Sequence, residues 1–532
     1  MGAEEVPMSI PQWSPPVELS NEEEFIAARL KRTGRLFTFL RRHRHELFDA
    51  EFQAELELMY SDRAYGTSPK PPAMLAMVTL LQAYQKTSDA VAVENAMLDR
   101  RWQMVLGCLG VEEPPFSQGA LVDFRWRLTK HDMDRRLLER TVDLAEKTGA
   151  FGHTALRIAL DSAPLWGAGR VEDTFNLIGH AMEVVVDCAA VVAGMTPSKV
   201  RDEAGTELLG QSSIKGAIDI DWDDKAEQQQ ALERLLADVV ALRSWVSSNL
   251  SDKAERPPLK EALELLERVV EQDIEPDPDG GGSRIRHGTA PDRRISITDG
   301  EMRHGRKSKS RVINGFKRHV ATDLDTGLIL AATVRPANER EFAAEDDIRP
   351  DVERIGDVGE LHIDRGYLSG SWARELHERG DAVFSKPWSA QTDRFGKTDF
   401  QFNFEAAAVT CPGGATASIR RTSPAQPERA TFASATCRRC ELRARCLPAS
   451  AKSGRTITLH EAESLLQTLR EVRKTPEGRA KLRERVAVEH ALAHVCNRQG
   501  PRARYIGARK NTFDVRRIAA VQNLHTIQRK AA

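Results

Sequence analysis

The chain lacks a large net charge of either sign and lacks long apolar runs. Its 532 residues include 77 Lys and Arg against 78 Asp and Glu, so the formal net charge is -1. A nucleic-acid-binding protein shows its basic character either globally or in patches, so the net charge alone does not indicate DNA binding. No stretch of roughly 18 apolar residues is evident, and we therefore expect no membrane span.

Targeting signals and an even set of cysteines are also missing. The N-terminus is acidic and rich in proline, unlike a secretory signal peptide, so we expect a cytoplasmic protein with no membrane partner. The chain has seven cysteines, an odd number in a large protein without an export signal. This argues against a framework of disulfides.

Charge is instead segregated along the chain. Residues 219–279 are dominated by Asp and Glu, whereas residues 303–319 contain no acid. An acidic insertion therefore masks a basic body, whose cations are candidates for contact with nucleic-acid phosphates. The basic run contains Arg303, Arg306, Lys307, Lys309, Arg311, Lys317 and Arg318.

Two aspartates directly follow predicted strands. Asp161 ends an alternating run, residues 156–160, that is typical of a half-buried strand. Asp364 closes a second short strand, residues 361–363, and precedes a helix-like stretch. We therefore predict that both carboxylates lie at strand tips.

A third acid, Glu489, lies within a long predicted helix. The helix is expected to begin at Thr475, a capping residue followed by proline, and to stop at Gly500. Two strand acids and one helix acid match an RNase H-like arrangement that holds two Mg²⁺ (or Mn²⁺) ions for phosphoryl transfer. Asp161 would bridge both ions, while Asp364 and Glu489 would each complete one coordination sphere.

Short stretches spread over most of the chain form an ordered pattern around these acids. They are residues 159–162, 315–319, 323–327, 334–339, 362–367, 485–489, 504–507 and 523–524. In this order they resemble the DDE transposases of bacterial insertion sequences that have an InsH-type N-terminal domain. The resemblance implies an α/β fold, cleavage at the element's ends, and attack of the freed 3′-hydroxyl on target DNA. The implied partners are double-stranded DNA, as terminal inverted repeats and as target, and a second copy of the chain on that DNA.

The chain departs from this family around Glu489. Many relatives carry Tyr, Arg, Glu and Lys at fixed helical spacing, and their basic residues grip DNA phosphates. Arg485 keeps the arginine position, but Leu482 and Cys496 occupy the tyrosine and lysine positions. Arg498 or Arg502 would replace the missing lysine. Arg365, beside the second acid, and Arg504, in the C-terminal part of the pattern, complete the predicted DNA contacts.

The pattern divides the chain into regions. Residues 1–19 are expected to be a disordered tail, residues 20–150 a helical N-terminal domain that binds DNA, and residues 151–532 the catalytic domain. A helical insertion at 171–290 interrupts the catalytic domain, either as a solvated hairpin or as an arm for a partner. A Cys-rich insertion at 390–470 interrupts it again.

Four cysteines in the second insertion have spacing that suits a metal. Cys437 and Cys440 form a tight pair, Cys446 follows, and Cys411 supplies a fourth thiol on a predicted turn. Four thiolates in a reducing compartment suit tetrahedral structural zinc, in a zinc knuckle. Free thiols or a redox pair remain the alternative.

Two other function classes fit the same residues. One is an RNase H-like, metal-dependent nuclease that cuts DNA without strand transfer. The other is a non-catalytic DNA-binding protein derived from a transposase. Retention of all three acids argues against the second class, because a binding protein has no need of them.

Overall fold

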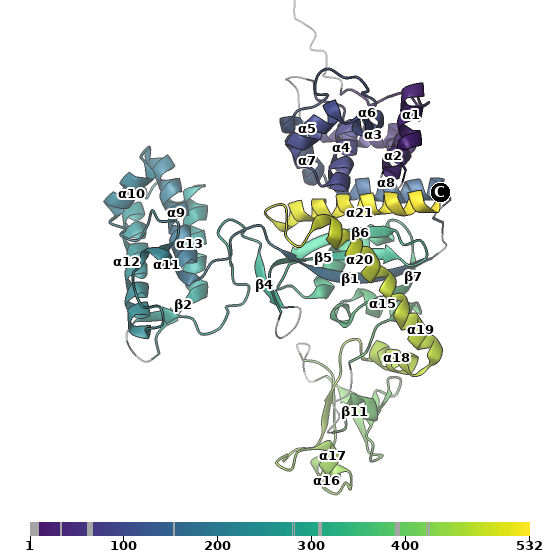
Figure 1. The fold of residues 1–532 in the computed structure, drawn as a ribbon. Helices are drawn as coiled ribbons and strands as arrows, with labels where there is room; N and C mark the ends of the chain where they lie inside the picture. The colour runs from purple at the N-terminus through teal and green to yellow at the C-terminus, as the bar shows by residue number, and fades with distance from the viewer. Residues whose placement is uncertain are drawn as a thin grey trace, which may run out of the picture.

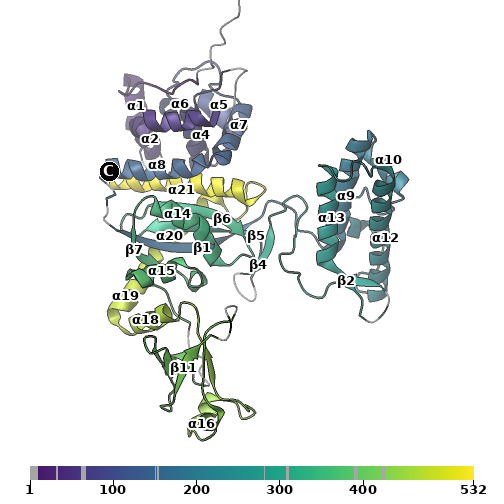
Figure 2. The ribbon, with the colours of Figure 1, turned by 180° about the vertical axis from the view of Figure 1, so that it is seen from behind.

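The computed structural model describes residues 10–31, 34–60, 68–149, 151–152, 155–278, 280, 282–306, 311–388, 394–421, 423 and 426–531. A mixed sheet lies at the centre of the molecule (Figure 1). A helical N-terminal region covers one side of it, and two insertions project away from it, as the view from behind also shows (Figure 2). The architecture is therefore mixed α/β.

The N-terminal region is helical, and five of its eight described helices begin with a side-chain cap, at Ser20, Asp49, Ser88, Asp99 and Ser117. Ser20 Oγ accepts a hydrogen bond from the Glu23 amide, and the Glu23 carboxylate accepts one from the Ser20 amide, so the two residues form a capping box. Trp102 and Phe124 are fully buried, so these aromatics form core rather than surface. The helices are α1 (Asn21–Arg29), α2 (Arg35–Leu47), α3 (Ala50–Glu57), α4 (Pro72–Gln85), α5 (Asp89–Leu98), α6 (Arg100–Leu106), α7 (Gln118–Lys130) and α8 (Met133–Lys147).

Residues 10–19 correct the expectation of a disordered tail through residue 19. Trp13 is buried, and its indole Nε1 donates to the Leu106 carbonyl at 3.1 Å. The Trp13 amide also donates to Gln53 Oε1 at 2.8 Å. A single large aromatic side chain with a satisfied N–H is enough to hold this proline-rich segment against the helices.

The central sheet has six strands in the order β4-β5-β1-β7-β8, with β6 also paired to β5. The β1–β7 and β7–β8 pairs are parallel, and β5 runs antiparallel to its neighbours. Strands β5 and β6 form a hairpin, with Gly327 at φ +73° in its turn. The strands are β1 (Leu156–Trp166), β4 (Arg303–Arg306), β5 (Val312–Asp323), β6 (Ile329–Pro336), β7 (Val358–His362) and β8 (Ala382–Phe384).

Helix α21 (Ala508–Lys530) lies between the sheet and the N-terminal helices (Figures 1 and 2). Its buried Asn523 accepts from the Ile329 amide at 2.7 Å and donates to the Ile329 carbonyl and to Thr141 Oγ1. One amide thus ties α21 to β6 and α8. The other helices around the sheet are α14 (Glu345–Glu353), α15 (Trp372–Arg379), α18 (Glu463–Lys474), α19 (Pro476–Glu484) and α20 (Val486–Gln499).

The first insertion is a helical bundle with its own apolar core. Its helix α9 (Thr174–Ala193) has a mean hydropathy of 1.5 and is long and apolar enough to cross a membrane, which corrects the expectation of no such stretch. Leu177, Ile178 and Val185 are fully buried, so α9 serves as the core helix of the bundle. The remaining elements are α10 (Pro197–Ala204), α11 (Ile214–Ala217), α12 (Lys225–Asn249), α13 (Leu259–Asp273), β2 (Ile274–Pro276) and β3 (Ser283–Ile285).

The second insertion is a small antiparallel sheet in the order β13-β12-β11-β10-β9. Phe400, Val409 and Phe432 form the centre of its core, and Cys411, Cys437 and Cys446 pack against that core. Its elements are β9 (Gln401–Asn403), β10 (Ala408–Thr410), β11 (Thr416–Arg420), β12 (Arg429–Thr431), α16 (Ser434–Arg438), α17 (Arg443–Cys446) and β13 (Thr456–Thr458).

Candidate active site

Asp161 lies in the middle of β1 rather than at its tip. The strand continues to Trp166 because antiparallel β5 pairs with it over that whole length. The parallel partner β7 pairs with β1 only as far as Ala159. Asp161 therefore lies just beyond the carboxyl end of the parallel ladder, where a side chain has no neighbouring strand on that side.

The other two acids, Asp364 and Glu489, lie where helices begin. Asp364 follows β7 with extended backbone, φ -81° and ψ 164°, and precedes the short 3-10 helix η3 (Arg365–Tyr367). Glu489 is in the first turn of α20. The predicted helix begins and ends as expected, because Thr475 Oγ1 accepts from the Gly478 amide at 3.0 Å and Gly500 caps the far end. It is divided at Arg485, however, into α19 and α20.

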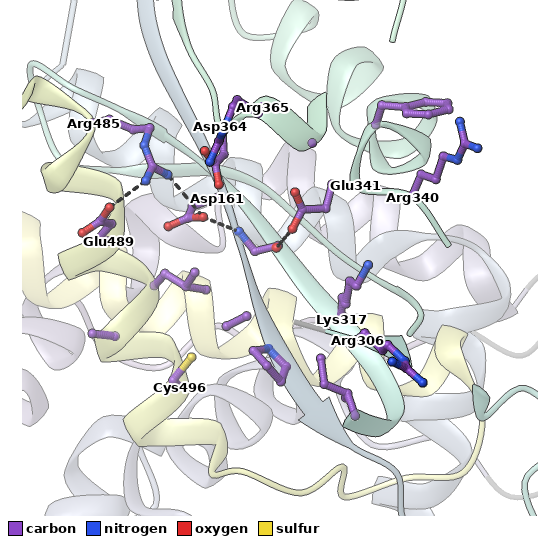
Figure 3. Close-up of a pocket in the computed structure, with 18 of the residues that line it drawn as sticks. Asp161, Arg306, Lys317, Arg340, Glu341, Asp364, Arg365, Arg485, Glu489 and Cys496 are labelled. Carbon is purple, nitrogen blue, oxygen red and sulfur yellow. Dashed lines mark hydrogen bonds and ion pairs between the residues drawn. The ribbon is translucent and has the colours of Figure 1, made fainter. Parts of the chain in front are cut away.

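The three acids line one cavity of about 1060 Å³ (Figure 3). Strand, loop and helix deliver them from positions 161, 364 and 489, so only the tertiary fold brings them together. Five cations line the same cavity, namely Arg306, Lys317, Arg340, Arg365 and Arg485. A cavity with clustered carboxylates and surrounding cations suits a metal-bound phosphate ester.

Arg485 lies between two of the acids (Figure 3). Its Nη1 is 3.3 Å from Asp161 Oδ1, and its Nη2 donates to Glu489 Oε1 at 2.7 Å. The Nη1 group is buried and has no hydrogen-bond partner among the described residues. The guanidinium therefore supplies positive charge between two carboxylates while keeping donor capacity for a further ligand.

The environment raises the pKa of Asp161. Burial is the largest cause, and the Glu489 and Asp364 carboxylates raise the pKa further by repulsion. The Arg485 guanidinium and the Ser162 amide, which donates to Asp161 Oδ1 at 2.8 Å, oppose this rise. Asp161 thus lies in a site that favours either a proton or an added cation.

Glu341 is a site residue that the sequence patterns did not reveal. Ser162 Oγ, adjacent to Asp161, donates to Glu341 Oε1 at 2.7 Å. Glu341 begins the 3-10 helix η2 (Glu341–Ala344) between β6 and α14, where no periodicity marks a residue. The only available signal was its position two residues after the matching stretch that ends at Glu339.

Among the predicted DNA contacts, Lys317 and Arg365 line the cavity with the acids. Lys317 Nζ donates to the Glu339 carbonyl at 2.7 Å, and burial lowers its pKa. Arg365 is exposed. Lys307 and Lys309 lie outside the described residues.

Arg318 corrects another expectation, because it is buried and cannot reach DNA phosphates. Its guanidinium donates to Gln499 Oε1 at 2.8 Å and to the Pro164 and Gly500 carbonyls. Successive side chains on a strand point to opposite faces, so Arg318 points away from the face of Lys317. Arg318 holds the end of α20 against β1.

The other predicted arginines, Arg498, Arg502 and Arg504, are not among the residues that line the cavity of the acids. Arg498 lies over the Tyr84 ring, with its Cζ 5.9 Å from the ring centroid, and Arg504 donates to the Thr87 carbonyl at 3.1 Å. Arg502 donates to the carbonyls of Gly167 and Ala168. Cys496, at the family's lysine position, lines the cavity itself.

A second group of charges lies close in sequence to the three acids, on β1, β7 and α19. We call it the ion cluster, and its members are Arg157, Glu360, His362, Lys481 and Glu484. Arg157 donates to Glu360 Oε1 at 2.9 Å and pairs with Glu484, and Lys481 lies 3.1 Å from Glu360 Oε2. Hydrogen bonds from Arg157, His362 and Lys481 outweigh burial and lower the Glu360 pKa to about 2.

In the described part of the chain, one group of three potential metal ligands has its ligand atoms within 4.8 Å of one another. This group consists of Glu360, His362 and Glu484. Arg157 and Lys481 already neutralise both carboxylates, so the group is an ion-pair network rather than a metal site. The acids around Arg485 are spread more widely because the guanidinium lies between two of them.

The four cysteines of the second insertion line a separate cavity of about 500 Å³. None of them forms a disulfide. Burial and the three neighbouring thiols raise the pKa of Cys446, and the Arg455 amide donates to Cys437 Sγ at 3.5 Å. Within the described chain, no three of the four sulfurs lie within 4.8 Å of one another. The thiols therefore surround one cavity at wider spacing than a bound ion requires.

Comparisons with protein families identify two domains in the chain. Residues 410–528 match the family described as "Transposase DDE domain", and residues 29–127 match "Transposase domain (DUF772)". The resemblance to DDE transposases with an InsH-type N-terminal domain is confirmed. The DDE match contains Glu489 and all four cysteines, and such a domain implies an RNase H-like core. Searches of curated proteins and of solved structures returned no match.

Proposed function

We propose that the protein cuts DNA at the ends of an insertion sequence and joins the freed ends to target DNA. The two transposase domains indicate DNA transposition and a phosphoryl-transfer enzyme. The observation that carries the finer proposal is the convergence of Asp161, Asp364 and Glu489 on one cavity lined by cations.

The donor set of this cavity fits divalent metal. Three carboxylates provide hard oxygen ligands of the kind that Mg²⁺ or Mn²⁺ prefers, and repulsion among them already raises the Asp161 pKa. Asp161, Asp364 and Glu489 would hold two ions. When bound, such ions activate the attacking oxygen and stabilise the leaving oxygen of a phosphodiester.

The chain's own residues supply the rest of the site. The Asp161 carboxylate is oriented by the Ser162 amide, and Ser162 in turn is held by Glu341. Arg485 lies between two of the acids and presents a buried Nη1 that has no hydrogen-bond partner in the described chain. A non-bridging phosphate oxygen is a suitable acceptor for that donor.

The test is metal-dependent cutting and joining of a duplex that carries the sequences flanking the coding frame. Asp161→Asn should reduce both steps by orders of magnitude, because metal assistance supplies several kcal/mol of barrier reduction. Asp364→Asn and Glu489→Gln should behave alike. Asp346→Asn is a matched control, since its side chain is 82% exposed on α14.

Full activity in Asp161→Asn would refute the site. The same assay separates the alternatives, because a nuclease would yield cut ends without joined products. A protein that only binds DNA would yield neither.

We also propose that the four cysteines hold a structural zinc ion. Their convergence on one cavity without disulfides supports this, and zinc would draw the sulfurs together around one tetrahedral centre. Protein purified without chelator should contain about one zinc per chain. Cys437→Ser should lose the metal and destabilise the second insertion, whereas Cys188→Ser, in the first insertion, should retain it. Elemental analysis that finds no zinc would contradict the proposal.

The DNA-bound form is proposed to be a homodimer, because transposition requires two ends to be held together. The N-terminal helical domain is proposed to recognise the terminal inverted repeats. Light scattering with and without a terminal-repeat duplex tests the first proposal, and a mass of one chain per duplex would contradict it.

A further inference from the structure

A second cavity beside the active site is lined by cations, and no acid is among its described lining residues. It has a volume of about 460 Å³ and contains Arg365, Lys386, Arg473, Arg479 and Arg483, together with Pro387 and Leu482. We call these five cations the arginine pocket. They come from η3, from the segment after β8, from α18 and from α19, so four separate parts of the chain build one positive surface.

Within the described residues, the cations of the arginine pocket have no carboxylate partners. In the described part of the chain, none of the five forms an ion pair with an acid at 4.0 Å or less. Among the described residues, Arg479 donates to backbone, at the carbonyls of Arg473 and Lys474. By contrast, Lys481 and Arg485 on the same stretch pair with Glu360 and Asp161.

This absence of neutralisation has a physical cost. Like charges gathered around one cavity repel one another, and the repulsion is relieved when an anion enters. Guanidinium groups match phosphate oxygens in geometry, so several unpaired arginines around one cavity are suited to a polyphosphate or a nucleic-acid backbone.

Arg365 connects the two cavities, because it lines both the arginine pocket and the cavity of the three acids. A DNA strand whose phosphate lies at Asp364 therefore has its next cations in the arginine pocket. We propose that the arginine pocket binds the backbone phosphates of the same DNA molecule that is cut at the acids, on one side of the scissile bond. This rests on the proposed function and adds a DNA-binding site that the family pattern around Glu489 does not contain.

The test is duplex binding at several salt concentrations. The full chain is titrated with a fluorescein-labelled 40-base-pair duplex of arbitrary sequence, in Ca²⁺ to prevent cutting, between about 50 and 300 mM salt. The test variant carries Lys386→Gln, Arg473→Gln and Arg483→Gln. Arg479 is left in place because it bonds to backbone. The matched control carries Lys225→Gln, Arg234→Gln and Arg243→Gln, three exposed cations on α12 of the first insertion.

The test variant should bind roughly tenfold or more weakly near 150 mM salt, and its slope of log K against log salt should fall by about 0.9 for each phosphate that it no longer neutralises. The control should match the wild type. Equal slopes in test and control variants would overturn the proposal. If the test variant alone has a lower melting temperature, the single substitutions Lys386→Gln and Arg483→Gln are measured instead, and unchanged slopes there have the same meaning.

The outcome is separable from that of the proposed function. If the wild type cuts DNA and Asp161→Asn does not, while the arginine-pocket variant binds like the control, then only the arginine pocket is refuted. If the wild type shows no salt-dependent binding to duplex DNA, both proposals fail.

Discussion

The acids of the active site and the ion cluster lie on the same three parts of the chain, yet their charges are arranged in opposite ways. Arg157, Glu360 and Glu484 precede Asp161, Asp364 and Glu489 by four, four and five residues. In the ion cluster two cations face two carboxylates, whereas at the active site Arg485 alone lies between two of three carboxylates.

The pKa shifts express this difference. Hydrogen bonds from three neighbours hold the Glu360 pKa near 2, so its charged form stabilises the folded state. Burial and repulsion raise the pKa of Asp161, so its charged form opposes folding. The paired charges of the ion cluster thus stabilise the fold. The acids of the active site are only partly neutralised and repel one another, and a bound cation would reduce this repulsion.

The largest effect on the free energy of unfolding is expected for a substitution in the ion cluster, at Arg157. Arg157→Ala removes a guanidinium that joins β1 to both Glu360 and Glu484, and these half-buried carboxylates lose most of their compensation. The free energy of unfolding should fall by about 1–3 kcal/mol. Urea denaturation followed by tryptophan fluorescence measures this. Arg157→Lys should recover only part of the stability, because one ammonium group cannot replace the guanidinium contacts to Asp325, Glu360 and Glu484. An unchanged midpoint in Arg157→Ala would show that the cluster is not structural.

A pH dependence should distinguish the two regions next. Glu360 has a folded pKa of about 2 against an ordinary value of 4.5, so its contribution is present above about pH 4.5 and is lost as the pH falls toward 2. The difference in unfolding free energy between wild type and Glu360→Gln should therefore shrink below about pH 4.5. A difference that stays constant from pH 6 to pH 3 would contradict the assigned ion pairs.

The smallest effect on the free energy of unfolding is expected for a substitution at Asp161, and this effect has the opposite sign. Asp161→Asn removes a charge whose pKa is raised, so the metal-free variant should be as stable as the wild type or slightly more stable at neutral pH. The melting temperature in chelator, compared with that of Glu360→Gln, tests this sign. A clear loss of stability in Asp161→Asn would mean that the Arg485 contact outweighs the repulsion.

Much of the local structure follows from sequence patterns. The Ser20 capping box, the β5–β6 hairpin and the ends of the α19–α20 segment are predictable because caps and turns depend on residues only a few positions apart. The DDE transposase domain is also identifiable from ordered short stretches, three of which lie within residues 410–528. The N-terminal segment around Trp13 is not, because its order depends on Gln53 and Leu106.

The side-chain environment of the cations is less predictable. Arg318 adjoins Lys317 in the basic run and is expected there as a DNA contact, but strand alternation and the end of α20 bury it. The arginine pocket combines residues from 365 to 483, and none of them stands out in the sequence except Arg365. Unpaired cations are recognisable only once every acid within reach is known.

The sequence by itself determined which acids are available and the kinds of element that carry them. Only the tertiary structure decided which cation neutralises which acid. Arg157 meets Glu360 across 203 residues and Glu484 across 327, while Arg485 finds Glu489 one helical turn away. Coulomb energy depends on distance and on burial, and neither quantity is a function of separation along the chain. For this reason the chemical identity of the three acids could be predicted, whereas their partners and their pKa shifts required the fold.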